Sequence, residues 1–166
     1  MREVKITEVA GKILEQLPKG AFLTVKHGDK VNTMTIGWGT IGTIWRKPMF
    51  MVMVRYSRYT YELIDKADSF TVSFPLEGQL KDALSLCGTK SGRDVDKFKE
   101  SGITLQPGVS VDSPSIAECD VVVECKIKYK QPMDPEQVPQ EVKDIFYGNS
   151  DYHVLYYGEI MKVFEK

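Results

Sequence analysis

The segment from Asn32 to Thr60 decides how the rest of the chain is interpreted. It begins NTMTIGWGTIG (residues 32–42), continues through the apolar run PMFMVMV (48–54) and ends with RYSRYT (55–60). Glycines let a backbone approach a ligand closely, an indole can cover a flat ring, and guanidinium groups hold oxygen-rich anions. The segment therefore predicts a site for a ligand with a flat aromatic end and a phosphate end.

The length and composition indicate a globular protein, which we expect to form a single domain over residues 1–166. Hydrophobic residues make up 42% of the chain and charged residues 27%, which favours a folded core over disorder. The net charge of -1 gives no overall attraction to nucleic acid or to an anionic membrane. No apolar run approaches the roughly 20 residues of a membrane helix, and Glu3, Lys5 and Glu8 stand where a signal peptide would be apolar. We therefore expect a cytoplasmic location.

The hydrophobic pattern predicts a mainly β fold, a largely antiparallel barrel with peripheral helices. We expect strands at 21–26, from 31 onward, 49–54, 69–74, 118–130 and 152–164. We expect helices at 7–17 with Thr7 as its cap, from Ser57 or Thr60 to 67, at 79–86, from Asp94 to 102, and at 141–146. Strands and helices do not alternate regularly, which argues against a doubly wound parallel sheet. The strand 49–54 is apolar on both faces, so a helix or a partner subunit should cover its outer face, and we expect a homodimer.

The cysteines and histidines do not form a recognisable metal or disulfide pattern. Cys87, Cys119 and Cys125 cannot all pair within one chain, and the last two are expected on one strand, too far apart to be bridged. The chain has neither a Cys-x-x-Cys pair nor a histidine-rich cluster. We therefore expect reduced thiols and no metal site.

Three glycines, Gly37, Gly39 and Gly42, match the Gly-x-Gly-x-x-Gly fingerprint of dinucleotide-binding folds. That motif must open a helix, whereas here Trp38 occupies an inner position and Pro48 follows soon after. We therefore interpret residues 32–42 as a polar, glycine-rich loop whose backbone and indole border a ligand. A glycine-rich hairpin with Trp38 in the core is an alternative that this segment alone leaves open.

Two basic segments are candidates for binding a phosphate. Arg55, Ser57, Arg58 and Thr60 supply guanidiniums and hydroxyls where a helix should begin, although they could also be an ordinary helix start. The loop from Lys90 to Lys97 adds three cations, which Asp94 and Asp96 could instead neutralise.

His153 and Cys87 are the remaining candidates for a chemical role. A histidine at a barrel rim could donate a hydrogen bond to a cofactor or substrate, but a partly buried histidine without function is also common. Cys87 is expected near a helix C-terminus, where no positive field lowers the pKa of a thiol, so packing is its expected role.

Taken together, these blocks resemble the flavin reductase-like family, and more closely its flavoredoxin branch. The resemblance is carried by residues 32–42, Lys47 and Pro48, 55–63, Cys87 and Gly88, 90–98, and 151–153 with Gly158 and Glu159, in the expected order. It implies a split β-barrel of Greek-key type, a homodimer, and flavin mononucleotide (FMN) at or near the dimer interface. It therefore covers essentially the whole chain.

The resemblance also implies roles for individual residues. The residues that it places around the isoalloxazine ring are Asn32, Met34, Thr35, Trp38 and Thr40, with the adjacent Thr33 also counted as cofactor-binding. Those that would hold the phosphate and ribityl chain are Arg55, Ser57, Arg58 and Thr60, with Cys87, Gly88, Ser91 and Lys97 closing the site. His153 falls where related reductases use a histidine near the nicotinamide.

The leading hypothesis is an FMN-binding flavoprotein, an oxidoreductase that carries electrons from NADH, NADPH or a protein donor through FMN. One alternative keeps the cofactor but is an electron carrier without nicotinamide turnover. Another is a non-enzymatic barrel that binds a different anionic aromatic ligand or a protein partner.

Overall fold

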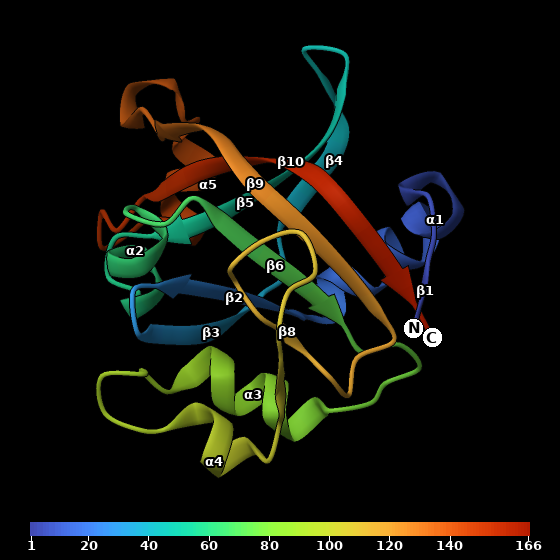
Figure 1. Ribbon diagram of the computed structural model, residues 1–166. Helices are drawn as coiled ribbons and strands as arrows, with labels where there is room; N and C mark the ends of the chain where they lie inside the picture. The colour runs from blue at the N-terminus through green and yellow to red at the C-terminus, as the bar shows by residue number, and fades with distance from the viewer.

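The computed structural model describes residues 1–166 as one curved main sheet and a small two-stranded sheet, with helices around them (Figure 1). The strands are β1 Arg2–Glu3, β2 Ala21–His27, β3 Lys30–Ile36, β4 Gly39–Ile44, β5 Lys47–Arg55, β6 Ser69–Phe74, β7 Leu105–Gln106, β8 Ser115–Ile116, β9 Val121–Pro132 and β10 His153–Glu165. The helices are α1 Ile6–Gln16, α2 Tyr59–Ile64, α3 Lys81–Thr89, α4 Lys97–Ser101 and α5 Gln140–Phe146, with short 3₁₀ turns at Leu17–Lys19 and Pro135–Gln137. None of these helices has the length and apolarity needed to cross a membrane.

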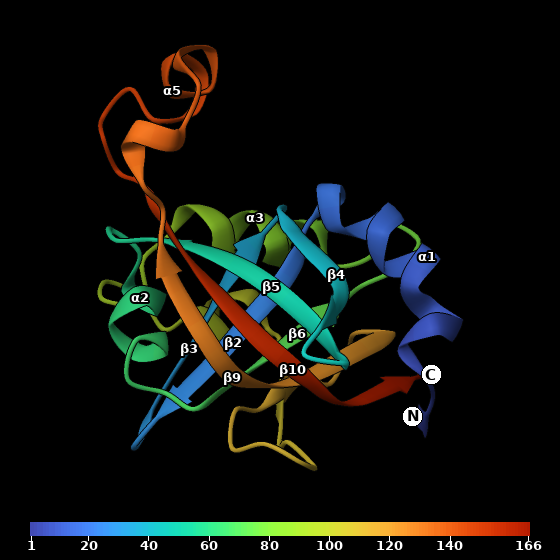
Figure 2. The same ribbon diagram turned by 90° about the horizontal axis from the view of Figure 1, so that it is seen from above.

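The main sheet has the order β3-β2-β6-β9-β10-β5-β4, and β1 pairs with β10. All of these pairings are antiparallel, which confirms the predicted fold class. The two longest strands, β9 and β10, cross the centre of the sheet, and their connection forms an arm that carries α5 away from the barrel (Figure 2). The helices α3 and α4 lie beside β2 and β3, while α1 and α2 lie at opposite ends of the barrel (Figures 1 and 2).

The core fills the inside of the curved sheet. Phe50, Phe70, Phe74 and Tyr156 are fully buried there, and Val9 and Ile13 of α1 pack against the same cluster. A smaller cluster joins α3 to β2 through Leu84, Phe22 and their neighbours. Burial of this apolar surface is the main force that closes the sheet.

Two predicted helix starts are wrong in detail. The helix α1 begins after Lys5 rather than at Thr7, because the carboxylate of Glu8 accepts the Lys5 amide at 2.7 Å and completes the first turn. The helix α2 begins after Arg58, so neither predicted cap closes it. Thr60 lies inside its first turn, and Ser57 binds the carboxylate of Asp151 instead.

Two further helix ends differ from the prediction. The helix α3 continues through Cys87 and Gly88 to Thr89, and the Lys90 amide closes it by donating to the Leu86 carbonyl oxygen at 2.9 Å. The helix α4 begins after Asp96 rather than Asp94, since the Asp96 side chain accepts the Lys99 amide at 3.1 Å.

The segment 32–42, predicted as a loop, consists of the end of β3, a short link at Gly37 and Trp38, and the start of β4. The turn between β4 and β5 has Trp45 and Arg46 at φ of 52° and 60°, which are left-handed conformations typical of a tight hairpin. In the single chain β5 is covered mainly on one face. Phe50, Val52 and Val54 are fully buried, whereas Met51 and Met53 on the other face are half-buried.

Candidate functional site

Two adjacent clefts open at the end of the barrel where β3, β5 and α2 meet. The first, which we call the strand cleft, has a volume of about 220 Å³ and is lined by Met34, Thr35, Ile36, Gly37, Trp38, Met53, Arg55, Arg58 and His153. The second, which we call the loop cleft, has a volume of about 140 Å³ and is lined by Asn32, Met34, Ser57, Arg58, Tyr59, Thr60, Thr89, Lys90, Ser91, Arg93 and Lys97. Met34 and Arg58 line both clefts, so the two spaces meet at these side chains.

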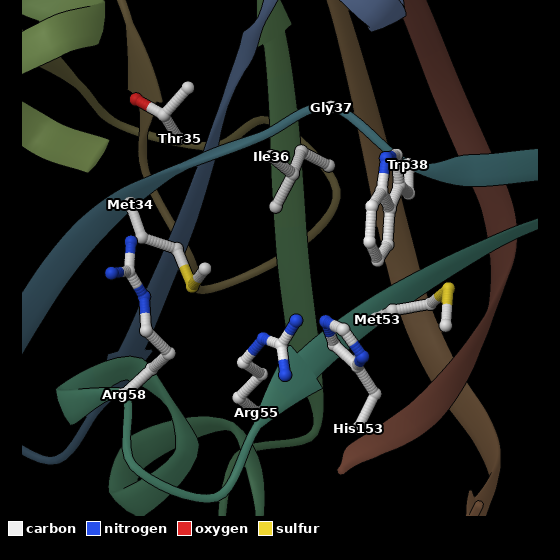
Figure 3. A pocket seen from close by; sticks show the side chains of 9 residues that line it. All are labelled: Met34, Thr35, Ile36, Gly37, Trp38, Met53, Arg55, Arg58 and His153. Carbon is white, nitrogen blue, oxygen red and sulfur yellow. The ribbon is translucent and has the colours of Figure 1, made fainter. Parts of the chain in front are cut away.

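The register of the sheet assembles the strand cleft. Arg55 at the end of β5 is the direct partner of His153 at the start of β10, although 97 residues separate them in the chain. Figure 3 shows these two side chains beside Met53, with Trp38 across the opening. Trp38 is 43% exposed, and its ring centre lies 5.5 Å from that of His153. The indole is therefore a wall of the cleft rather than part of the core, against the hairpin alternative.

His153 is almost fully buried, and the Tyr147 hydroxyl lies 2.7 Å from its Nδ1. Burial lowers the pKa of His153 to about 4, and Arg55 adds to this effect while Asp151 opposes it. The imidazole is therefore neutral at neutral pH.

The two arginines of the strand cleft are held in different ways. Arg55 donates to the carbonyl oxygens of Phe146, at 2.9 Å, and Asp151, and it lies over the ring of Tyr147. Arg58 donates from both terminal nitrogens to the carbonyl oxygen of Gly88, at 3.0 and 2.9 Å. Burial lowers the pKa of Arg58, and Arg55 lowers it further while Asp151 raises it. A guanidinium has five donors, so Arg58 keeps donors for a ligand at the junction of the clefts.

Buried polar contacts hold the floor of the loop cleft in place. Asn32 donates to the Thr60 hydroxyl at 2.8 Å, and Lys97 donates to the carbonyl oxygens of Thr33 at 2.8 Å and Cys87 at 2.9 Å. Burial lowers the pKa of Lys97 to about 8, and nearby Arg58 also lowers it, while Cys87 raises it. A Cβ at Gly92 would overlap Asn32 Oδ1, so glycine lets the 90–97 loop close against this floor.

The loop cleft is strongly cationic. Four of its lining residues, Arg58, Lys90, Arg93 and Lys97, are basic, and none is acidic. Arg93 pairs with Glu62 outside the cleft, whereas the Lys90 amine makes no ion pair. The alternative, in which Asp94 and Asp96 neutralise this loop, does not hold, since neither carboxylate forms an ion pair with these cations. Such a cluster suits a phosphate group.

The structure brings most of the candidate residues together. Those in the strand cleft are Met34, Thr35, Trp38, Arg55, Arg58 and His153, and those in the loop cleft are Asn32, Met34, Ser57, Arg58, Thr60, Ser91 and Lys97.

Four candidates line neither cleft. The Thr33 side chain is buried against β2, where its hydroxyl donates to the Leu23 carbonyl oxygen, and Thr40 is exposed on β4. The Cys87 thiol is buried in the cluster between α3 and β2, and burial raises its pKa, in keeping with the packing role predicted for it. Gly88 contributes only through the carbonyl oxygen that accepts from Arg58.

Sequence reasoning missed several residues around the clefts. Met53 lines the strand cleft, and Tyr59 and Thr89 line the loop cleft. Ile36 and Gly37 also line the strand cleft, and they lie in the 32–42 segment that was predicted to border a ligand. Tyr147 lies behind His153, and Phe146 packs edge-on against Trp38 at 5.1 Å. The consecutive aromatics Phe146 and Tyr147 at the end of α5 were the one available signal.

A ligand with a ring and a phosphate fits the pair of clefts but not either one alone. Small-molecule sites commonly have volumes of about 300–1,000 Å³, which each cleft falls short of by itself. Trp38 and Arg58 line the same space, so one ligand could contact both. The unused donors of Arg58 and the free amine of Lys90 stand where a phosphate could accept hydrogen bonds.

Comparisons with known proteins point to one family. The family model described as flavin reductase like domain matches residues 16–166. An uncharacterised protein of Archaeoglobus fulgidus is 30% identical over 157 residues, which cover 95% of this chain and 78% of that protein. Among solved structures, flavoredoxin from Methanosarcina acetivorans superposes with a TM-score of 0.69 at 27% identity, covering 89% of this chain and 68% of that one. Flavoredoxin of Desulfovibrio vulgaris is similar, with a TM-score of 0.69 at 26% identity and coverage of 89% and 69%.

Proposed function

Since the chain belongs to the flavin reductase-like family, with its split β-barrel and its likeness to the flavoredoxins, we propose that it is an electron-transferring flavoprotein that binds FMN. The isoalloxazine ring occupies the strand cleft, and the phosphate occupies the loop cleft. The observation that carries this proposal is the junction at Arg58, where a cleft walled by an indole meets a cleft lined by four cations and no carboxylate.

Each part of the chain has a defined task in this proposal. Bound FMN supplies the redox chemistry, and the protein supplies binding, orientation and electrostatics. Trp38 covers the ring and keeps water from it, while the neutral His153 and the two arginines present donors to the oxygen-rich edge of the ring. Lys90, Lys97 and Ser91 hold the phosphate. No side chain has to act as a general base, in keeping with the neutral His153 and the donor-rich lining of the strand cleft.

The proposed assembly is a homodimer. The outer face of β5, β9 and β10 carries the half-buried side chains of Met51, Met53, Leu155 and Tyr157. Beside them Trp45 is 63% exposed and Tyr129 is 45% exposed, with their ring centres 6.4 Å apart. A second copy would remove this apolar surface from water. The single domain over residues 1–166 and the cytoplasmic location stay predictions.

The test of cofactor binding is the visible spectrum of the purified protein, before and after addition of FMN. Flavin absorbance that remains with the protein after gel filtration supports the proposal. A colourless protein that takes up no FMN would overturn it, and a stable dimer that ignores flavins would favour a barrel that binds another anionic aromatic ligand or a protein.

The electron donor is a separate question. We propose a reduced nicotinamide as the donor, because Trp38 in the lining of the strand cleft is 43% exposed and leaves a surface on which a second flat ring can pack. Anaerobic stopped-flow mixing of the FMN-loaded protein with NADH or NADPH should bleach the flavin rapidly. If neither nucleotide bleaches it while a reduced electron-transfer protein does, the chain is an electron carrier without nicotinamide turnover.

A further inference from the structure

The contact between Tyr147 and His153 is the one buried side-chain interaction beside the strand cleft that the proposed function leaves without a role. Tyr147 follows α5 at the base of the arm and is only 4% exposed. Its hydroxyl lies 2.7 Å from His153 Nδ1 and makes no other hydrogen bond. Its ring is fixed from two sides, by stacking on Tyr152 at 4.7 Å and by the Arg55 guanidinium at 4.9 Å.

The chemistry of the two groups decides which of them donates. A neutral imidazole has one N–H donor and one nitrogen acceptor, and a phenol can donate or accept. The phenol is the more acidic donor and the bare imidazole nitrogen is the stronger base, so the favoured hydrogen bond runs from the tyrosine hydroxyl to Nδ1. The reverse arrangement would leave the buried hydroxyl hydrogen without an acceptor, which costs free energy.

We propose that Tyr147 is a positioning residue that holds His153 in the tautomer with its hydrogen on Nε2, so that the strand cleft receives an N–H donor. In Figure 3 one ring nitrogen of His153 points into the space between Arg55 and Trp38. Since Nδ1 is engaged by Tyr147, that nitrogen is Nε2. The lowered pKa of His153 keeps the ring in this neutral form at neutral pH.

The fixed tautomer has a consequence for the ligand class. Arg55 and Arg58 can only donate, Thr35 already donates its hydroxyl hydrogen to the Leu84 carbonyl oxygen, and His153 adds a further donor. The strand cleft therefore selects a ligand group that accepts hydrogen bonds, such as a carbonyl or carboxylate oxygen. The selection of such a ligand group rests on the proposed function, whereas the tautomer of His153 does not.

Nitrogen-15 NMR of the imidazole rings tests the proposal directly. The chain has only two histidines, and the exposed His27 at the end of β2 provides an internal reference. At neutral pH we expect His153 Nδ1 to have the shift of an unprotonated nitrogen and Nε2 that of a protonated one. In Tyr147→Phe the ratio of the two tautomers should shift about 2- to 10-fold towards Nδ1–H, as expected for the loss of one hydrogen bond.

Tyr152→Phe is the matched control, because Tyr152 stacks on the same ring but its hydroxyl makes no contact with His153. This variant should keep the wild-type tautomer. A wild-type protein with the hydrogen on Nδ1 would overturn the proposal, as would equal shifts in wild type and Tyr147→Phe. The measurement involves neither FMN binding nor flavin reduction, so its failure is distinguishable from failure of the proposed function.

Discussion

The strand cleft and the loop cleft are neighbours that are built in opposite ways. Paired strands hold the strand cleft, and its histidine is neutral because burial lowers the pKa of His153 to about 4. Helix starts and the 90–97 loop hold the loop cleft, which has four basic lining residues. Buried strand pairs are rigid, whereas loops adapt to what they bind. In this fold the strand cleft is therefore suited to orient a ligand, and the loop cleft is suited to attract its charge.

The largest expected effect tests whether His153 in the strand cleft is neutral. The pKa of His153 falls from an ordinary 6.5 to about 4 on folding, so the unfolded chain binds more protons between these two pH values. The free energy of unfolding should therefore decrease as the pH falls through this window, by up to roughly 3 kcal/mol from His153 alone. Urea unfolding of wild type and His153→Gln at pH 7 and pH 4 measures the difference, and identical pH dependence in the two proteins would show that His153 is not buried in this way.

The next effect concerns Arg58, which belongs to both clefts. Removing a charged hydrogen-bond donor costs about 1.5–3 kcal/mol, so Arg58→Ala should weaken FMN binding by about 10- to 100-fold. Quenching of flavin fluorescence measures the dissociation constant. Arg46→Ala, at the exposed turn between β4 and β5, is the matched control and should bind FMN like the wild type. If Arg58→Ala also behaves like the wild type, the two clefts do not share one ligand.

Lys97 should make FMN affinity depend on pH in the alkaline range. Its pKa is lowered to about 8, so the ammonium loses its proton as the pH rises above that value. Loss of this charge from the loop cleft should weaken FMN binding by about tenfold between pH 7 and pH 9.5. Lys97→Met should lack this dependence, and Lys99→Met, on the exposed side of α4, should retain it. An affinity that stays constant over this range in the wild type would contradict a contact between Lys97 and the phosphate.

The smallest effect tests whether Trp38 is a wall of the strand cleft or a core residue. Trp38 is partly exposed, so Trp38→Ala should change the free energy of unfolding by no more than about 0.5 kcal/mol. It should weaken binding of FMN by about fivefold, since an aromatic contact contributes about 0.5–1.5 kcal/mol. Flavin titration and urea unfolding of the same preparation give both numbers. A large loss of stability with unchanged affinity would instead identify Trp38 as a core residue.

The sequence allowed the loop cleft to be predicted better than the strand cleft. Four residues of the loop cleft lie within Arg55–Thr60 or its flanks, and the rest of its cations lie in one short loop, so the cluster is visible in the chain itself. The approach of His153 to Arg55 depends on the register between β5 and β10, which no local pattern specifies. Tyr147 was missed for the same reason. Its contact with His153 depends on the path of the arm between β9 and β10, which no local pattern in the sequence specifies.

The errors among the candidate residues also have a physical cause. The interpretation of residues 32–42 as a loop concealed the alternation of β3, in which Asn32 and Met34 face the loop cleft while the Thr33 side chain points to the opposite face of the sheet and accepts a hydrogen bond from the Thr24 hydroxyl. Thr40 follows on β4 and is exposed. Cys87 lies on the face of α3 that packs on β2, which the predicted end of that helix had obscured.

The central claim is that one ligand extends from the strand cleft into the loop cleft. Calorimetric titration of the purified protein with FMN and with riboflavin, which has the same ring but no phosphate, tests it most directly. FMN should bind at least about tenfold more tightly, because only its phosphate meets the four basic side chains of the loop cleft. Equal affinities, or binding of neither flavin, would contradict the claim.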